Sequence, residues 1–590
     1  MLHRLSSILD RLGTTGAARL AAGLGQGLVL GALWKASQLK AWPATDPVTF
    51  TALAFAFLYA PLVWLQGLTH IPKRWLLWWT FVVALVCAAL GAHAAYRETI
   101  KPDNVLPLPE TPIYVFLTVA FFIAQTLIVA ATADRRAVAA YQTYFDTAWK
   151  HGVQAAASIG FTIALWGLLN LGAELFKLIG LEFLQTLIRN AWFAGPMTGL
   201  AVAIAVHVTD VRPALVQGIR TLALTLLSWL LPVLALIVAG FVVSLVATGL
   251  TPLWNTKIAA ALLLGVTAAL VILINAAYQD GLSATAPILR RVVQFSLILP
   301  APLIAIAVYA LTLRVKEYGW TVDRVIALGC VVVAACYGIG YALAAVRPRT
   351  TKLYLERCNI ATSVVAIVVI VAIFSPLADP ARISVNSQMA RLTSGKISAD
   401  AFDYKYLRFD AGLYGTEALQ KLAAGDVRIA DVRERARIAS KMEHKYDSLP
   451  QTKTSLAAHI VPLRANQTIP DGFLDQPQTS LASSCLVQQN TSCDMLLADL
   501  DGDGFDEVIL FDTAESIPPF FYKREPDGAW RYAGTLPARL GCADMRAQLR
   551  SGDFALAAPA TVWKEIEIGG LRFPANEFRA FSPCPPAPPK

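Results

Sequence analysis

Residues 112–132 read PIYVFLTVAFFIAQTLIVAAT, an uncharged and almost wholly apolar stretch. A helix rises about 1.5 Å per residue, so this stretch is long enough to cross a hydrocarbon core of roughly 30 Å. Unpaired backbone groups are costly in lipid, and a helix satisfies all of them internally. The stretch therefore predicts a membrane-spanning helix.

The same pattern recurs along the first two thirds of the chain. Each run holds 17 or more mainly apolar residues, and the first lacks a small-x-small cleavage site, so we take it as a helix and not a signal peptide. Three intervening stretches, 138–150, 181–190 and 214–220, predict short interfacial helices. The eleven predicted spans lie near 19–35, 49–69, 75–96, 112–132, 153–173, 192–208, 222–248, 256–277, 293–314, 325–345 and 358–376.

The charge of the chain is unevenly spread. Charged residues make up 15% of the sequence, apolar residues make up 56%, and the formal net charge is +9. Up to Pro376 there are 26 Lys and Arg against 14 Asp and Glu, whereas from Leu377 onward there are 24 against 27. The basic excess belongs to the loops of the membrane region, so it is not the surface patch that nucleic-acid binding requires. We expect a lipid bilayer, and no nucleic acid, as the partner of this region.

The loop charges also predict an orientation. Lys and Arg total 16 in the alternate loops on the N-terminal side and 10 in the opposite loops. Because cytoplasmic loops carry the excess of Lys and Arg, we expect the N-terminus to be cytoplasmic. An odd number of spans then places the C-terminal region in the periplasmic or other extracytoplasmic space.

Cysteine placement is an independent argument for the same orientation. Four cysteines lie in or beside apolar runs, where a reduced cysteine behaves as a small hydrophobe; they are Cys87, Cys330, Cys336 and Cys358. The other four lie in the C-terminal region, where an even number suits two disulfides in an oxidising compartment. Of three possible pairings we favour Cys485–Cys493 with Cys542–Cys584; the alternative is four free thiols in a cytosolic domain.

The chain changes character after the last apolar run. We predict a transmembrane domain over 1–378, a helical extracytoplasmic segment over 379–449, a β-rich extracytoplasmic domain over 450–582 and a Pro-rich tail over 583–590. Short apolar runs at 495–498, 507–511, 520–523 and 530–534 alternate with Gly, Pro and Asp turns, which indicates strands. The predicted fold is a mainly α membrane protein with about eleven transmembrane helices, followed by a soluble α+β domain.

An acidic loop in this last domain carries the sharpest chemical signal. Residues 499–507 read DLDGDGFDE between two apolar runs. Carboxylates at alternate positions, with glycines that allow a tight reversal, can converge on one hard cation. We predict a structural Ca²⁺ site with Asp499, Asp501, Asp503 and Glu507 as ligands. The alternative is an acidic Asp-Gly hairpin turn that binds no metal.

Polar residues within spans are the default functional candidates of a membrane domain. Here they lie towards span ends, where solvation is available, so we expect structural roles and no proton or ion relay. They are Asn170 and Glu174 in the fifth span, His207, Asp210 and Arg212 at the end of the sixth, and Asn275 and Asp280 at the end of the eighth.

A stripe of small residues lies in the first span. Gly23, Gly27 and Gly31 recur at four-residue spacing and so share one helix face. Small residues let helix backbones approach closely in a membrane. The stripe therefore predicts tight packing against another helix.

The sequence contains none of the motifs that would name a reaction. There is no Walker A loop, no HExxH, no GxSxG, and no GxGxxG after a predicted strand. An energy-coupled pump and a standard hydrolase are therefore disfavoured, and no catalytic residue is predicted.

Several stretches resemble a known family. They read NAWFAGP at 190–196, DVRP at 210–213, INAAYQDG at 274–281, YGWTVDR at 318–324, FDYKYLR at 402–408 and GLYG at 412–415. Over about 10–450 the chain resembles the bacterial DUF4153 membrane-protein family, which implies a bacterial inner-membrane location and no established activity. The acidic loop resembles the calcium loops of FG-GAP and VCBS repeats, in a single copy without their propeller.

Three functions fit these expectations. The first is an envelope protein that anchors a periplasmic interaction domain, with other envelope proteins as possible partners. The second is a transporter of a small solute or lipid, which a deep polar cavity at mid-bilayer would favour. The third is a membrane enzyme acting on lipid-linked substrates, with Glu174, Arg189 and Arg408 gripping phosphate. A lateral groove at the outer leaflet, lined by Arg and a carboxylate, would favour that enzyme.

Overall fold

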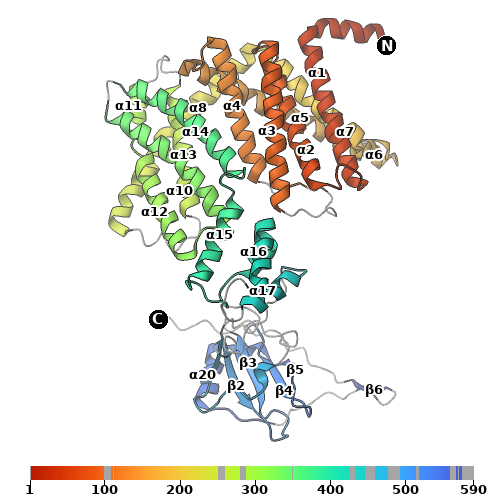
Figure 1. Cartoon of the computed structure of the whole chain (residues 1–590), viewed down its shortest axis with the longest axis vertical. Coiled ribbons are helices and arrows are strands. Elements are labelled where there is room, and N and C mark those ends of the chain that lie inside the picture. The colour runs from red at the N-terminus through yellow and green to blue at the C-terminus, as the bar shows by residue number, and fades with distance from the viewer. Residues whose placement is uncertain are drawn as a thin grey trace. The chain divides into compact units, whose positions relative to one another are not determined.

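The computed structural model of the chain forms two compact units (Figure 1). The membrane unit comprises Met1–Arg391 and Asp410–Ala418, and the C-terminal unit comprises Leu392–Phe409 and Leu419–Lys590. The structure describes residues 2–98, 106, 108–109, 112–249, 259–279, 287–347, 350–425, 432–445, 457, 459–475, 492–512, 517–557, 566–568 and 571–573.

The membrane unit is a bundle of helices. Eleven helical segments of the described chain are long and apolar enough to cross a membrane, which confirms the predicted number of spans. The helices are α1 (Leu2–Gln38), α2 (Pro47–Gly67), α3 (Lys73–Glu98), α4 (Pro112–Asp134), α5 (Tyr141–Leu178), α6 (Phe183–Arg189), α7 (Ala191–Val211), α8 (Pro213–Thr248), α10 (Ala259–Tyr278), α11 (Pro287–Ser296), α12 (Pro300–Tyr318), α13 (Val322–Ala345), α14 (Thr351–Ile373) and α15 (Pro380–Thr393).

Two of the three predicted interfacial helices are wrong. Residues 141–150 and 214–220 are the first turns of the long helices α5 and α8, because no proline separates them from the apolar run that follows. Pro213 stands at the first position of α8, where its missing N–H removes no helical hydrogen bond. Only the stretch 181–190 forms a separate short helix, α6.

The spans of the membrane unit fall into two groups. One core is built by α2, α3 and α4, and a second by α8 and α10 to α14. Figure 1 shows them as a red-to-orange and a yellow-to-green set of helices. Helix α14 contacts both α13 and α4, and Ile370 and Ile373 of α14 lie in the first core. The two groups are therefore joined along α14.

The glycine stripe of the first span packs against α7, as the sequence predicted. A Cβ built on Gly27 would lie 2.1 Å from the carbonyl oxygen of Gly195, and one on Gly23 would lie 2.4 Å from that of Gly199. A Cβ on Gly31 would lie 2.7 Å from the carbonyl oxygen of Ala191. Only glycine allows this backbone-to-backbone contact.

Helix α15 continues from the last span and is fixed to the bundle. The Asp379 carboxylate caps it by accepting hydrogen bonds from the backbone N–H groups of Ala381, at 2.9 Å, and Arg382, at 3.3 Å. Farther along α15, Ser384 Oγ donates to the carbonyl oxygen of Trp320 at 3.1 Å. The side chain of Gln388 donates to the carbonyl oxygens of Tyr318 and Trp320, both at 3.1 Å.

The C-terminal unit contains helices and a small sheet, which confirms the predicted α+β character. A five-stranded sheet has the order β1–β2–β3–β4–β5, with β1 parallel to β2 and all other pairs antiparallel. The helices and strands are α16 (Gly412–Ala424, mostly in the membrane unit), α17 (Val432–Lys441), α20 (Ala543–Ser551), β1 (Ile460–Pro462), β2 (Cys493–Ala498), β3 (Glu507–Asp512), β4 (Phe520–Arg524), β5 (Trp530–Thr535), β6 (Ile566–Ile568) and β7 (Leu571–Phe573).

Both faces of this sheet are covered. Met495, Val508 and Tyr522 pack on one face with Phe473, whose ring makes an edge contact with that of Trp530. On the other face Leu496, Ile509 and Phe511 pack with Leu549 of α20. Every residue of β3 is buried, as expected for a central strand covered on both sides.

Candidate functional site

A densely connected polar group of the membrane unit centres on Asp210 at the end of α7. Its carboxylate accepts hydrogen bonds from Arg19 Nη2 at 2.8 Å, Lys150 Nζ at 2.5 Å and Thr69 Oγ1 at 2.9 Å. Arg19 is 1% exposed, and its Nε also donates to the carbonyl oxygen of Leu65. A buried arginine inside a span is stable only when its N–H groups are paired in this way.

His70 completes the cluster and its neighbours determine its tautomer. Lys150 Nζ lies 2.7 Å from His70 Nε2, and an ammonium can only donate, so Nε2 accepts. His70 Nδ1 then carries the proton and donates to Thr69 Oγ1, which in turn donates to Asp210. Burial, reinforced by the charge of Lys150, lowers the pKa of His70. The imidazole is therefore held neutral.

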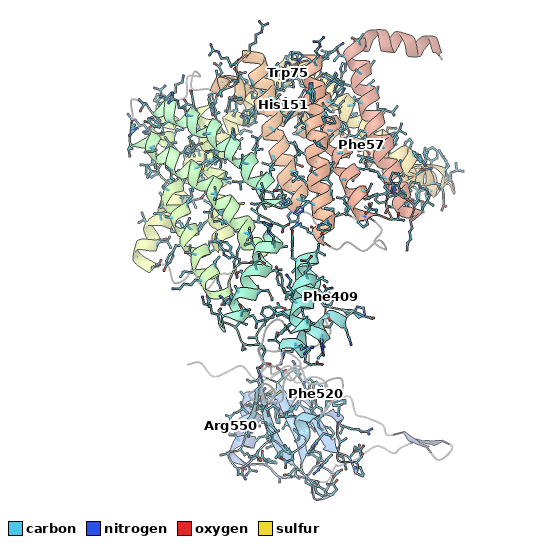
Figure 2. The ribbon with its side chains drawn as sticks, viewed as in Figure 1. Phe57, Trp75, His151, Phe409, Phe520 and Arg550 are labelled. Atoms are coloured by element: carbon cyan, nitrogen blue, oxygen red, sulfur yellow. The ribbon has the colours of Figure 1, made fainter. Side chains whose placement is uncertain are left out.

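The Asp210 cluster, defined as Arg19, Thr69, His70, Lys150 and Asp210, ties four parts of the bundle together. Its members come from α1, the turn after α2, α5 and α7. Figure 2 places His151, the neighbour of Lys150, at the end of the membrane unit where Trp75 lies. The cluster therefore holds α1, α5, α7 and the turn after α2 together, in keeping with the structural role predicted for Asp210.

The sequence did not predict the partners of Asp210. They come from positions up to 191 residues away, and hydropathy says nothing about which helix ends meet. The feature of the sequence that could have pointed to these partners is the presence of charged residues within predicted spans or beside their ends. Of the two residues predicted with Asp210, Arg212 is exposed, whereas His207 has a buried Nδ1 with no hydrogen-bond partner among the described residues.

A second polar group lies between α5, α10, α13 and α14. Tyr141 Oη donates to Asn275 Oδ1 at 3.0 Å, and Asn275 Nδ2 donates to Tyr341 Oη at 2.7 Å. Tyr341 Oη donates to Asn359 Oδ1 at 2.8 Å, and Asn359 Nδ2 donates to Asn275 Oδ1 at 2.7 Å. We call Tyr141, Asn275, Tyr341 and Asn359 the Asn–Tyr cluster. It is uncharged, and Asn275 is its only member that the sequence singled out.

One cavity adjoins the Asn–Tyr cluster, and a second lies next to the first. The first, of about 530 Å³, is lined by Tyr141, Asn275 and Asn359 together with apolar side chains of α4 and α5. The second, of about 520 Å³, shares Val119 and Tyr337 with the first and is lined mainly by apolar residues. These cavities suit hydrocarbon better than a charged or strongly polar solute.

A third cavity, of about 810 Å³, lies at the corner between α12 and α13. Its lining includes the charged residues Arg314, Glu317, Asp323 and Arg324. This corner is held by α15, the helix that follows the last span. The structure thus brings two arginines and two carboxylates to one cavity at the end of the membrane unit from which α15 departs.

The other polar residues predicted in spans form no site in the described chain. Asn170 is exposed and donates to the carbonyl oxygen of Trp166 on its own helix, and Glu174 is exposed. No described contact joins Glu174 to Arg189. Arg408 lies in the C-terminal unit, where its Nε donates to the carbonyl oxygen of Met442. Asp280 lies outside the described residues.

The acidic loop joins β2 to β3, two antiparallel strands in which Ala498 pairs with Glu507. Carboxylate oxygens of Asp499, Asp501 and Glu507 all lie within 4.8 Å of one another. Asp499 also accepts hydrogen bonds from the N–H groups of Gly502 and Gly504, at 2.7 and 3.0 Å. Both the metal site and the acidic hairpin turn predicted from the sequence are compatible with this geometry.

A lysine from β4 lies against the same loop. Lys523 Nζ pairs with the Asp501 carboxylate and lies 3.2 Å from Asp503 Oδ2. Its ammonium lowers the pKa of Asp501, whereas burial raises the pKa of Glu507. Asp503 lies outside the group of three carboxylates that approach one another. Lysine and a cation would therefore compete for Asp501.

The cysteines divide between the two units. The thiols of Cys87, Cys330, Cys336 and Cys358 are free, and all four residues lie on membrane-spanning helices. Cys493 on β2 and Cys542 before α20 are buried in the C-terminal unit. Cys485 and Cys584 lie outside the described residues, so the proposed pairing stays a prediction.

Comparison with known proteins identifies a family. No curated protein and no solved structure matches the chain. A family model described as a domain of unknown function, DUF4153, matches residues 49–422, which run from α2 into α16 and make up more than half of the chain. The match includes Asp210 and the whole Asn–Tyr cluster, and excludes the acidic loop. The protein is therefore a multi-span membrane protein that belongs to the DUF4153 family.

Proposed function

We propose that the protein is an inner-membrane envelope protein whose membrane unit anchors and positions the C-terminal unit outside the cytoplasm. The eleven candidate spans of the described chain are an odd number, which supports opposite sides of the bilayer for the N-terminus and the C-terminal unit. The excess of Lys and Arg in the loops on the N-terminal side supports a cytoplasmic N-terminus. The C-terminal unit is then exported and free to bind other envelope proteins.

The attachment of α15 carries this proposal. Asp379 caps the helix, Ser384 and Gln388 bind the corner between α12 and α13, and Arg391 Nη2 donates to the carbonyl oxygen of Glu317 at 2.6 Å. A chain that merely left the membrane would need none of these contacts. The hydrogen bonds fix α15 against the bundle, as expected if this helix supports the domain that follows it.

Calcium and disulfides are proposed as stabilisers of the displayed unit. The mutual approach of the Asp499, Asp501 and Glu507 carboxylates supports a weak calcium site, of the kind that extracellular modules use at roughly 10⁻⁴–10⁻³ M calcium. Among the described cysteines, the free thiols lie on membrane-spanning helices, which supports oxidation of the four C-terminal cysteines.

Lipid handling is the second candidate function. Two neighbouring apolar cavities of about 520 and 530 Å³, the second beside the Asn–Tyr cluster, favour a lipid over a small polar solute. The corner cavity has the Arg and carboxylate lining expected for a lipid-linked substrate, which supports this candidate. An enzyme would also need a catalytic arrangement there, and the sequence carries no motif that would identify one.

Topology is tested with reporter fusions after residue 450. Alkaline phosphatase fused there should be active and green fluorescent protein dark, because the first folds only outside the cytoplasm and the second only inside. Fusions after Arg212, on the opposite side of the bilayer, are the matched control and should give the reverse pattern. A fluorescent fusion at 450 would refute the proposed orientation.

Anchoring is separated from lipid handling by replacing the membrane unit. The C-terminal unit is fused to an unrelated single-span anchor of the same orientation and expressed in cells that lack the protein. If the bundle only anchors and positions, the fusion should restore envelope integrity, measured as resistance to detergent. Failure of a correctly exported fusion would refute a purely anchoring role and favour lipid handling.

A further inference from the structure

The corner pocket is the cavity of about 810 Å³ between α10, α12 and α13. Its polar wall comes from Arg314, Glu317 and Tyr318 of α12 and from Asp323 and Arg324 of α13. Its apolar wall consists of alanines at the start of α10, Ala310 and Leu311 of α12, and Ala327 of α13. The pocket is thus amphipathic, with hydrocarbon surface on one side and four formal charges on the other.

The two arginines converge on one aromatic ring. The guanidinium carbon of Arg314 lies 5.7 Å from the ring centroid of Tyr318, and that of Arg324 lies 5.5 Å from the same centroid. A phosphate placed beside this ring is within reach of both guanidiniums. Planar guanidinium groups bind phosphate through paired N–H donors, and two guanidiniums bind a phosphate more strongly than a single cation does.

The carboxylates make the pocket formally neutral. Glu317 and Asp323 line the same cavity as Arg314 and Arg324, so two negative charges balance two positive charges. An anion alone would bring Glu317 and Asp323 into repulsion with it. A ligand that carries both a phosphate and a cation matches all four side chains at once.

The polar wall is rigid before any ligand arrives. Gly319 has φ +77°, and a Cβ there would lie 2.7 Å from the side chain of Arg391. Arg391 donates to the carbonyl oxygen of Glu317, and Arg324 Nη1 donates to that of Gly319 at 2.6 Å. Because the turn between α12 and α13 is fixed by these bonds, little conformational freedom is lost on binding.

We propose that the corner pocket binds the headgroup of phosphatidylethanolamine, with the phosphate between Arg314 and Arg324 and the ammonium against Glu317 and Asp323. The acyl chains then lie along the alanine-rich wall formed by α10 and α13. Phosphatidylglycerol carries the phosphate without a cation. Phosphatidylcholine carries a cation without N–H donors, so it makes no hydrogen bond to a carboxylate. This site does not depend on the anchoring role.

The test uses the full-length protein purified in an uncharged detergent. The three lipids, with identical acyl chains, are added in equal amounts, and bound lipid is measured by native mass spectrometry and by the shift in melting temperature. Phosphatidylethanolamine should be bound about three- to tenfold more than either of the other two, the preference that one or two partly exposed ion pairs give. Equal or greater binding of phosphatidylglycerol would overturn the proposal.

Charge variants assign the preference to this pocket. Glu317→Gln with Asp323→Asn leaves two arginines unbalanced, so the preference should shift to phosphatidylglycerol. Both carboxylates are exposed, so the variant should still fold. Retained preference for phosphatidylethanolamine would overturn the assignment. Arg314→Gln with Arg324→Gln should weaken binding of all three lipids.

Two controls complete the design. Arg347 stacks over the ring of Tyr354, 4.9 Å from its centroid, at the other end of α13, so Arg347→Gln removes a similar arginine away from the pocket. It should leave the lipid preference unchanged. Soluble phosphoethanolamine, which has the headgroup without acyl chains, should give no shift at the same concentration. An equal shift would overturn the assignment to a lipid.

Discussion

His93 and Asp379 are 286 residues apart in the sequence, yet His93 Nε2 and Asp379 Oδ2 lie 2.8 Å apart. Asp379 is 1% exposed, caps α15, and has Arg97 Nη1 at 3.6 Å from its other oxygen. The pair joins α3 to the start of α15, so one carboxylate both begins the helix and holds it to the bundle. A buried carboxylate with several donors is expected to stay ionised.

Stability should fall at acid pH because of Asp379. Although burial raises the pKa of Asp379, the hydrogen bond from His93 and the charge of Arg97 outweigh it, so the pKa lies below the ordinary value. A lowered pKa gives stability that is present above about pH 4 and is lost as pH falls through the folded-state pKa. Thermal unfolding in detergent between pH 2.5 and 7 should show a smaller acid loss in Asp379→Asn. Asp146→Asn, at a carboxylate of α5 that is 45% exposed, is the control and should change the profile little.

Breaking the Asp210 cluster should destabilise the bundle. Asp210→Asn leaves Arg19 and Lys150 without their counter-charge, and removing one partner of a buried pair costs about 3–5 kcal/mol. Asp146→Asn breaks the pair with Arg220, whose carboxylate partner is 45% exposed, and should cost less than about 1 kcal/mol. Chemical denaturation of both variants measures the difference. Equal losses of unfolding free energy in the two variants would show that the Asp210 cluster does not hold these helices together.

Substitution of Gly27 should separate α1 from α7. Gly27→Ala places a methyl group 2.1 Å from the carbonyl oxygen of Gly195, which is backbone and cannot rotate away, so a cost of about 1–3 kcal/mol is expected. Gly25 is on the same helix with nothing within 4 Å of a built Cβ. Gly25→Ala should therefore be neutral or slightly stabilising, by up to about 1 kcal/mol from helix propensity. Melting temperatures of the two variants give the comparison.

Removal of Asn275 should disrupt the Asn–Tyr cluster. Asn275→Ala leaves Tyr141 and Asn359 with unmet hydrogen bonds in a nearly water-free region, at a cost of about 1–3 kcal/mol. Asn170→Ala is the matched control, because Asn170 is exposed and bonds only within its own helix among the described contacts. The control should unfold like the wild type. Equal stability of the two variants would argue against the cluster.

Calcium should stabilise the C-terminal unit. Addition of about 1 mM calcium to the full-length protein should slow proteolysis of this unit, and Asp499→Asn should abolish that protection. Lys523→Gln should raise calcium affinity, because it removes the cation that competes for Asp501. Asp527→Asn, in the turn between β4 and β5, is the control. No protection at several millimolar calcium would refute the metal site.

The sequence predictions were accurate where neighbouring residues determine the structure, and less so where residues far apart in the sequence meet. Each span is specified by its own run of apolar residues, and the strands 495–498 and 507–511 by local alternation with turns, so these elements were predicted closely. The glycines at 23, 27 and 31 indicated close packing without indicating α7. The partners of Asp210, and the packing of α10 against the corner between α12 and α13, depend on which helix ends meet. That information is absent from periodicity and composition, and it appears only with the packed bundle.

The contact between α1 and α7 cannot form in the order in which the helices are synthesised. During translation α1 enters the bilayer first, and its glycine stripe has no native partner until α2 to α6 have followed. Closure of the first half of the bundle therefore waits for α7, and a chain that stalls before α7 has its first helix packed on α2 but its glycine stripe unpaired.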